Sequence, residues 1–106
     1  MKIKKSTKSR QLKQVLGVAW YRREQWNRLL EVSADRDELE ENYDDWLRTA
    51  EGTLKGLKQM GTALVKVDID VNKLVAWCVV ANRTLDGAAR AEYVSKLLSE
   101  SADSIN

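Results

Sequence analysis

The chain has 106 residues, no proline, four Trp, three Tyr and no Phe, a composition that favours one helix-rich domain with a modest core. It contains no histidine and one cysteine, which excludes histidine-based catalysis, an internal disulfide and a cysteine-based zinc or iron–sulfur site within one chain. The formal net charge is +2, but the charges are distributed unevenly.

The first segment, Met1–Lys13, is strongly basic. It carries six of the 18 Lys and Arg residues and none of the 16 Asp and Glu residues, so the rest of the chain is mildly acidic. Because this segment is polar and poor in apolar side chains, we predict a disordered basic arm that the fold does not need. The alternative is an arm that contacts nucleic-acid phosphates, and nucleic acid is expected as a partner only through Met1–Lys13.

A helix is predicted to begin near Arg22, after the apolar stretch Val15–Trp20. Its apolar face is formed by residues at helical spacing, namely Trp26, Leu29 and Leu30. Trp20 and Tyr21 lie just before this helix and can fold back on its first turn as a hydrophobic staple does. We expect both aromatic side chains in the core or at an interface, and a ligand surface is the alternative.

A long helix is predicted over residues 35–60, where apolar residues recur in steps of three and four. Asp35 as cap and Glu38 three residues later match the capping-box arrangement. The start of this helix is strongly acidic and contains Asp35, Asp37, Glu38, Glu40, Glu41, Asp44 and Asp45. We interpret these acids as a solvated helix start that complements the helix dipole, with a cation site or a docking patch for a basic partner as the alternatives.

The segment after this helix changes from helical to strand periodicity. Gly61 stands where a left-handed helix stop is wanted. From Thr62 the alternation predicts a short extended segment over 62–69, whose inward face consists of Ala63, Val65, Val67 and Ile69. Its backbone needs hydrogen-bonding partners, and three arrangements are open. The segment can pair with Val15–Trp20, pair with its own copy across a two-fold axis, or remain an unpaired linker.

Asp70 is predicted to cap the next helix, whose apolar face includes Val71, Leu74 and Cys78. A thiol on that face is expected to be buried and unreactive. Because residues two apart on a strand point to the same side, Asp68 and Asp70 could together approach one Mg²⁺. We favour the structural roles of an exposed strand residue and a helix cap.

A turn is predicted over 82–87, followed by a last helix from Gly87 to about Glu100. Asp86 is the expected cap of this helix. The end of the chain, Ser101–Asn106, is expected to fray.

Two residues near the start of the last helix are candidates for interaction. Arg90 and Tyr93 share a face and could bind an anion or line a protein interface. For Arg90, an exposed ion pair with Asp86 is the favoured role.

Several short motifs form a set, namely Ala19–Arg22 with Gln25–Trp26, Ser33–Asp35, Trp46–Leu47, Lys66–Asp70 with Ala76–Cys78, and Asp86–Tyr93. With this set, the stretch from about Val18 to Leu98 resembles a group of small uncharacterised bacterial proteins that have no assigned function. The resemblance implies a bacterial origin, a cytoplasmic location and one compact domain. It implies no activity, substrate, cofactor or catalytic residue.

We therefore predict a small single domain over residues 14–100 that is mainly α, with about four helices and one short extended segment, or α+β if that strand pairs. No apolar run is long enough to cross a membrane and no signal-peptide pattern is found, so a cytoplasmic protein without a membrane partner is expected. The favoured function is a non-catalytic protein-interaction or regulatory module without a cofactor, whose partner is another protein or a second copy. The alternatives are a nucleic-acid-associated protein that uses the basic arm and a metal-dependent enzyme that uses Asp68 and Asp70.

Overall fold

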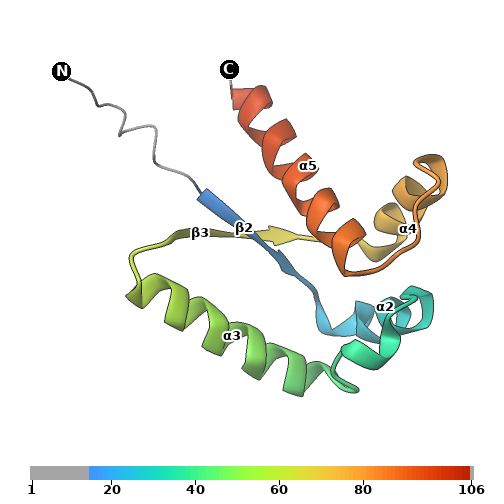
Figure 1. Cartoon of the computed structure of the whole chain (residues 1–106), viewed down its shortest axis with the longest axis horizontal. Helices are drawn as coiled ribbons and strands as arrows, with labels where there is room; N and C mark the ends of the chain where they lie inside the picture. Colours follow the sequence, from blue (N-terminus) through green and yellow to red (C-terminus); the bar gives the residue numbers. More distant parts are fainter. Residues whose placement is uncertain (1–14, 106) are drawn as a thin grey trace.

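The computed structural model describes the backbone of residues 15–105 and the side chains of residues 15–101 (Figure 1). Its regular elements are, in chain order, β2 (Val15–Trp20), α2 (Trp26–Val32), α3 (Tyr43–Gln59), β3 (Ala63–Asp68), α4 (Val71–Val80) and α5 (Gly87–Ile105). Short 3-10 turns at Arg23–Gln25 and Arg36–Glu38 precede α2 and α3. Within the described residues, four helices and one pair of strands make a mainly α domain, which confirms the predicted fold class. The basic arm Met1–Lys13 lies outside the described residues.

The two strands pair in parallel, with Val15 opposite Ala63 and Trp20 opposite Asp68. Parallel neighbours need a long crossover connection, which α2 and α3 supply between the end of β2 and the start of β3. Of the three arrangements that the sequence leaves open, pairing of Val15–Trp20 with the 62–69 segment is confirmed.

The sheet lies between α3 on one face and α5 on the other (Figure 1). Gly17 faces α5, because a Cβ placed on it would lie 2.9 Å from Val94 Cγ1 and 3.3 Å from Leu98 Cδ2. Trp20 faces α3, where the centre of its ring lies 5.1 Å from that of Trp46. Since side chains alternate along a strand, odd-numbered residues of β2 face α5 and even-numbered ones face α3.

The predicted inward face of β3 is buried only toward the end of the strand. Ile69 is 1% exposed and Val67 is half-buried, whereas Ala63 and Val65 are exposed. The packed interior lies beyond the carboxyl ends of the strands, where α2, α4 and the first turns of α5 meet (Figure 1). The buried residues of this core are Tyr21, Trp26, Leu29, Leu30, Ile69, Val71, Leu74, Cys78, Leu85, Ala89, Tyr93 and Val94.

Aromatic rings join the start of α3 to this core. The Trp46 ring lies 5.4 Å from that of Trp26, in a stacked arrangement, and 5.5 Å from that of Tyr21. The Tyr43 hydroxyl donates to the Tyr21 carbonyl at 2.8 Å. Beyond this end, Leu54 is the only buried residue of α3, and most residues of the helix are exposed to solvent.

The helix predicted over residues 35–60 begins later than expected, at Tyr43. Asn42 is its cap, since the Asn42 side chain accepts from the amide of Asp45 at 2.9 Å. Asp35 forms no cap hydrogen bond because its carboxylate binds Arg90 instead. The capping box with Glu38 is therefore wrong, and most of the acidic residues precede α3.

The predicted stop after α3 and the predicted caps of α4 and α5 are confirmed. Gly61 has a φ of 86°, the left-handed conformation that a helix stop requires. The Asp70 carboxylate accepts from the amides of Asn72 and Lys73 at 3.0 and 3.2 Å, and the Asp86 carboxylate accepts from the amide of Ala89 at 3.0 Å.

Helix α5 ends at Ile105, which is later than the end near Glu100 that the sequence predicts. The residues over 101–105 include no glycine or proline, so the backbone has no reason to leave the helix there.

Cys78 in α4 is buried as predicted, and burial raises the pKa of its thiol. In the part of the chain that the structure describes, none of the helices combines the length and apolar character that a membrane crossing requires.

Candidate functional site

Strand β2 leaves one of its edges unpaired within residues 15–105. Ile69 donates its backbone N–H to the carbonyl of Trp20 at 3.0 Å, so the polar backbone groups of Trp20 point toward β3. The N–H and C=O of one strand residue point to the same side, and this side alternates along the strand. The backbone groups of Val15, Gly17 and Ala19 therefore point away from β3.

An apolar groove of about 520 Å³ runs along this unpaired edge. Strand β2 forms its floor, and Trp46, Thr53 and Leu57 of α3 form one wall. The other wall belongs to α5 and consists of Arg90, Ala91, Val94, Ser95 and Leu98. Thr53, Ala91 and Ser95 are small and exposed, which leaves room for the side chains of a strand laid against β2. We refer to this feature as the β2 groove.

The opposite edge of the sheet, formed by β3, is protected by charge. The Lys66 ammonium lies 4.2 Å from the centre of the Trp20 ring, and the Asp68 carboxylate lies 3.7 Å from Arg22. Charged residues on an edge strand oppose pairing with a further strand, because pairing would remove them from water. Strand β2 carries no charged residue, so its edge has no such protection.

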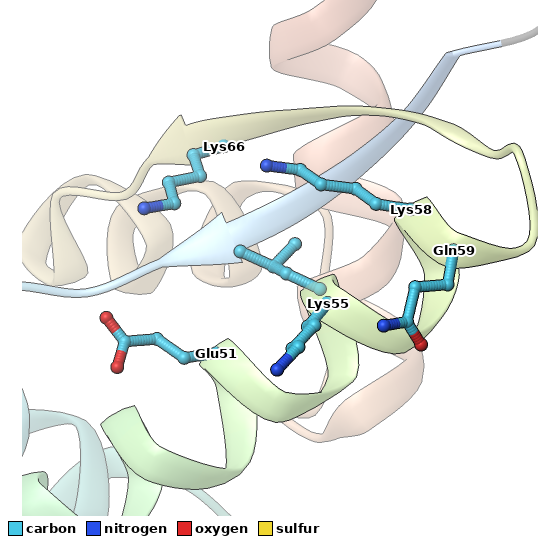
Figure 2. A pocket seen from close by; sticks show the side chains of 6 residues that line it. Glu51, Lys55, Lys58, Gln59 and Lys66 are labelled. Atoms are coloured by element: carbon cyan, nitrogen blue, oxygen red, sulfur yellow. The ribbon is translucent and has the colours of Figure 1, made fainter.

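A second pocket, of about 450 Å³, lies between β3 and α3 (Figure 2). Leu54 supplies apolar surface, and the surrounding polar side chains are Glu51, Lys55, Lys58, Gln59 and Lys66. Figure 2 shows that the lysine ammonium groups do not converge on one point. This pocket is a solvated, mainly cationic surface on the β3 side of the sheet, whereas the groove on the β2 side is apolar.

A buried ion pair lies where the β2 groove meets the core. Arg90 donates from its two terminal nitrogens to the two carboxylate oxygens of Asp35, at 2.9 and 2.7 Å, and also to Ser33 Oγ at 3.2 Å. The Arg90 and Asp35 side chains are only 12% and 15% exposed. Hydrogen bonds from Arg90 hold the pKa of the Asp35 carboxyl below its usual range. The prediction of an exposed ion pair between Arg90 and Asp86 is therefore wrong.

The four interaction candidates from the sequence are placed mostly inside the domain. Tyr21 and Tyr93 are 5% and 6% exposed, and burial raises the pKa of Tyr21 to about 12. The Tyr93 ring packs 5.4 Å from that of Trp77. Arg90 is held by its ion pair, so among the four only Trp20, half-buried beneath a lysine, keeps substantial access to solvent.

The proposed magnesium ligands have separate structural partners. One carboxylate oxygen of Asp70 accepts from two amides at the start of α4 and so caps this helix. The side chain of Asp68 is 70% exposed and faces Arg22. Within the described residues, no three Cys, Asp or Glu side chains are grouped so that they could hold a metal ion.

The walls of the β2 groove have no signal of their own in the sequence. Thr53, Ala91 and Ser95 are typical of any exposed helix face. The usable signal is the contrast between the strands, because Val15–Trp20 is free of charge and the second strand is not.

Comparison of the chain with models of protein families, with curated proteins and with solved structures gives no match. The resemblance to small bacterial proteins therefore stays a prediction, and the proposals below depend on the geometry alone.

Proposed function

We propose that this chain is a non-catalytic protein-interaction module that binds an extended, apolar polypeptide strand along the free edge of β2. The observation that carries the proposal is the outward-pointing backbone of a charge-free strand at the floor of an apolar groove. Strand addition of this kind obtains affinity from main-chain hydrogen bonds and specificity from the side chains that alternate along the added strand.

The energetics of the sheet support this function. An isolated pair of strands is marginally stable in water, and further strands make a sheet more stable. Here Val15 and Leu16, at the start of β2, are 48% and 47% exposed, although both are large apolar side chains. A further strand would cover them and satisfy the free backbone groups at the same time.

The proposal is tested with a synthetic peptide that copies the β2 sequence VLGVAW and carries a terminal lysine pair for solubility. We expect saturable binding of the labelled peptide by fluorescence anisotropy. Ser95→Arg places a long charged side chain in the groove and should weaken binding at least about tenfold, the equivalent of about 1.4 kcal/mol.

Ser99→Arg is the matched control, because it makes the same change on an exposed position of α5 that does not line the groove. It should leave binding unchanged. Absence of peptide binding at a concentration where light scattering shows the parent to be monomeric, or equal weakening by both variants, would contradict the proposed function.

A further inference from the structure

We infer that the strand that occupies the β2 groove is β2 of a second copy of this chain, paired antiparallel across a two-fold axis. The inference deepens the proposed function and rests on it. The product is a continuous four-stranded sheet in the order β3–β2–β2–β3, in which both β2 edges are closed and both outer edges are the charged β3 strands.

The direction of the backbone groups restricts the register. Only Val15, Gly17 and Ala19 point polar groups outward, so these residues must oppose one another. A two-fold axis at Gly17 sets Gly17 against its own copy and Val15 against Ala19 of the other chain. In this register every outward-facing residue of β2 has a directly opposed partner with which it exchanges hydrogen bonds.

Symmetry favours a second copy over an unrelated strand. An interface on a two-fold axis is self-complementary, because both copies contribute the same surface. One association event therefore places each β2 in the groove of the other chain. The even-numbered side chains Leu16 and Val18 of one copy then face the α3 wall of the other, near Thr53 and Leu57. The axis is normal to the sheet, so both α3 helices stay on one face and both α5 helices on the other.

Charge supports the antiparallel direction. The chain enters β2 at Val15 from Met1–Lys13, which carries six basic residues and no acid. At the other end of β2, Arg22 and Arg23 are paired with Asp68 and Asp44, and the groove adjoins the stretch 35–45, which has seven acids and one basic residue. There Leu39 lines the groove, and Asp37 and Glu41 beside it are exposed, with no ion pair to any described residue. Within one chain the two ends of β2 are separated by about 17 Å. Antiparallel pairing brings the basic entry of each copy to the acidic end of the other.

The competing occupant within the same chain is residues 1–14, whose six basic side chains would have to lie against an apolar groove.

The inference is tested by measuring the mass of the full chain in solution by light scattering over a range of concentrations. The parent and Ser99→Arg should reach twice 12.1 kDa. Ser95→Arg should remain near 12.1 kDa, and so should Ala19→Pro, which removes an outward N–H and leaves the hydrogen bonds between β2 and β3 intact. Far-UV circular dichroism checks that each variant is folded. The dimer should also weaken in about 0.5 M salt, because salt screens the attraction between the basic and acidic regions.

A parent chain that stays monomeric at every concentration but binds the β2 peptide would overturn the second-copy inference and leave the proposed function standing. A dimer that survives both Ser95→Arg and Ala19→Pro would show that the copies meet elsewhere, which also overturns it. If Ala19→Pro is unfolded, Ser95→Arg decides alone.

Discussion

The pair formed by Arg90 and Asp35 is the residue-level contact on which the domain depends most visibly. It joins the first turn of α5 to the loop after α2, through two parallel hydrogen bonds in a largely dry site. Such pairs add little to the free energy of unfolding relative to apolar residues of the same shape. Removal of one partner is costly, however, because it leaves the other charge buried without a partner. The sequence separation of 55 residues hides this contact from any argument based on helical spacing.

Asp35→Asn should therefore lower the free energy of unfolding by about 3 kcal/mol, as measured by urea denaturation at neutral pH. Asp44→Asn is the control, because Asp44 forms an exposed pair with Arg23 and its loss should change stability very little. A similar stability for the parent and Asp35→Asn would contradict the role assigned to this pair.

The same pair predicts a dependence on pH. The folded-state pKa of Asp35 lies below its unfolded value of about 3.9, so its stabilising contribution is complete above that value and is lost as the pH falls through the folded pKa. As the pH falls below about 4, the parent should lose more stability than Asp35→Asn. Parallel curves of stability against pH for the two proteins would contradict this expectation.

At the level of elements, the close approach of α5 to the sheet depends on one glycine. A Cβ on Gly17 would lie 2.9 Å from Val94 Cγ1, which is closer than carbon atoms pack without a shift. Gly56 in α3 differs, since a Cβ there would meet nothing within 4 Å.

Gly17→Ala should lower the free energy of unfolding by about 1–3 kcal/mol, because α5 must move away from β2. Gly56→Ala should raise it by as much as about 1 kcal/mol through helix propensity alone. Thermal unfolding of the two variants checks the contrast, and shifts in the same direction would contradict the packing described here.

Periodicity and local capping account for the elements that could be predicted from the sequence. The 62–69 strand, the stop at Gly61 and the caps at Asp70 and Asp86 all depend on neighbouring residues, and each is confirmed. The start of α3 at Tyr43 could not be predicted, because the carboxylate of Asp35 is taken by a residue distant in sequence.

The candidate site was less accessible to such reasoning. The groove exists because α3 and α5 lie on opposite faces of a sheet that, within the described residues, ends at β2, and no local pattern encodes that arrangement. Only the absence of charge in Val15–Trp20 could have indicated it.

For the whole molecule, the described residues form a well-packed core at one end and an incomplete sheet at the other (Figure 1). The core buries side chains from α2, α4 and α5, while the sheet has two strands between two long helices. Apolar side chains and backbone groups at the β2 edge remain available, and the charged β3 edge does not. This asymmetry makes association through β2 the central claim of the account.

The most direct test is residue-resolved amide hydrogen exchange of β2, measured by NMR at high and low protein concentration. The amides of Val18 and Trp20 point toward β3 and should be protected at both concentrations. The amides of Gly17 and Ala19 should be protected at high concentration and should exchange rapidly on dilution, giving an alternating pattern along the strand. Rapid exchange of Gly17 and Ala19 at every concentration would contradict the association of two copies through β2.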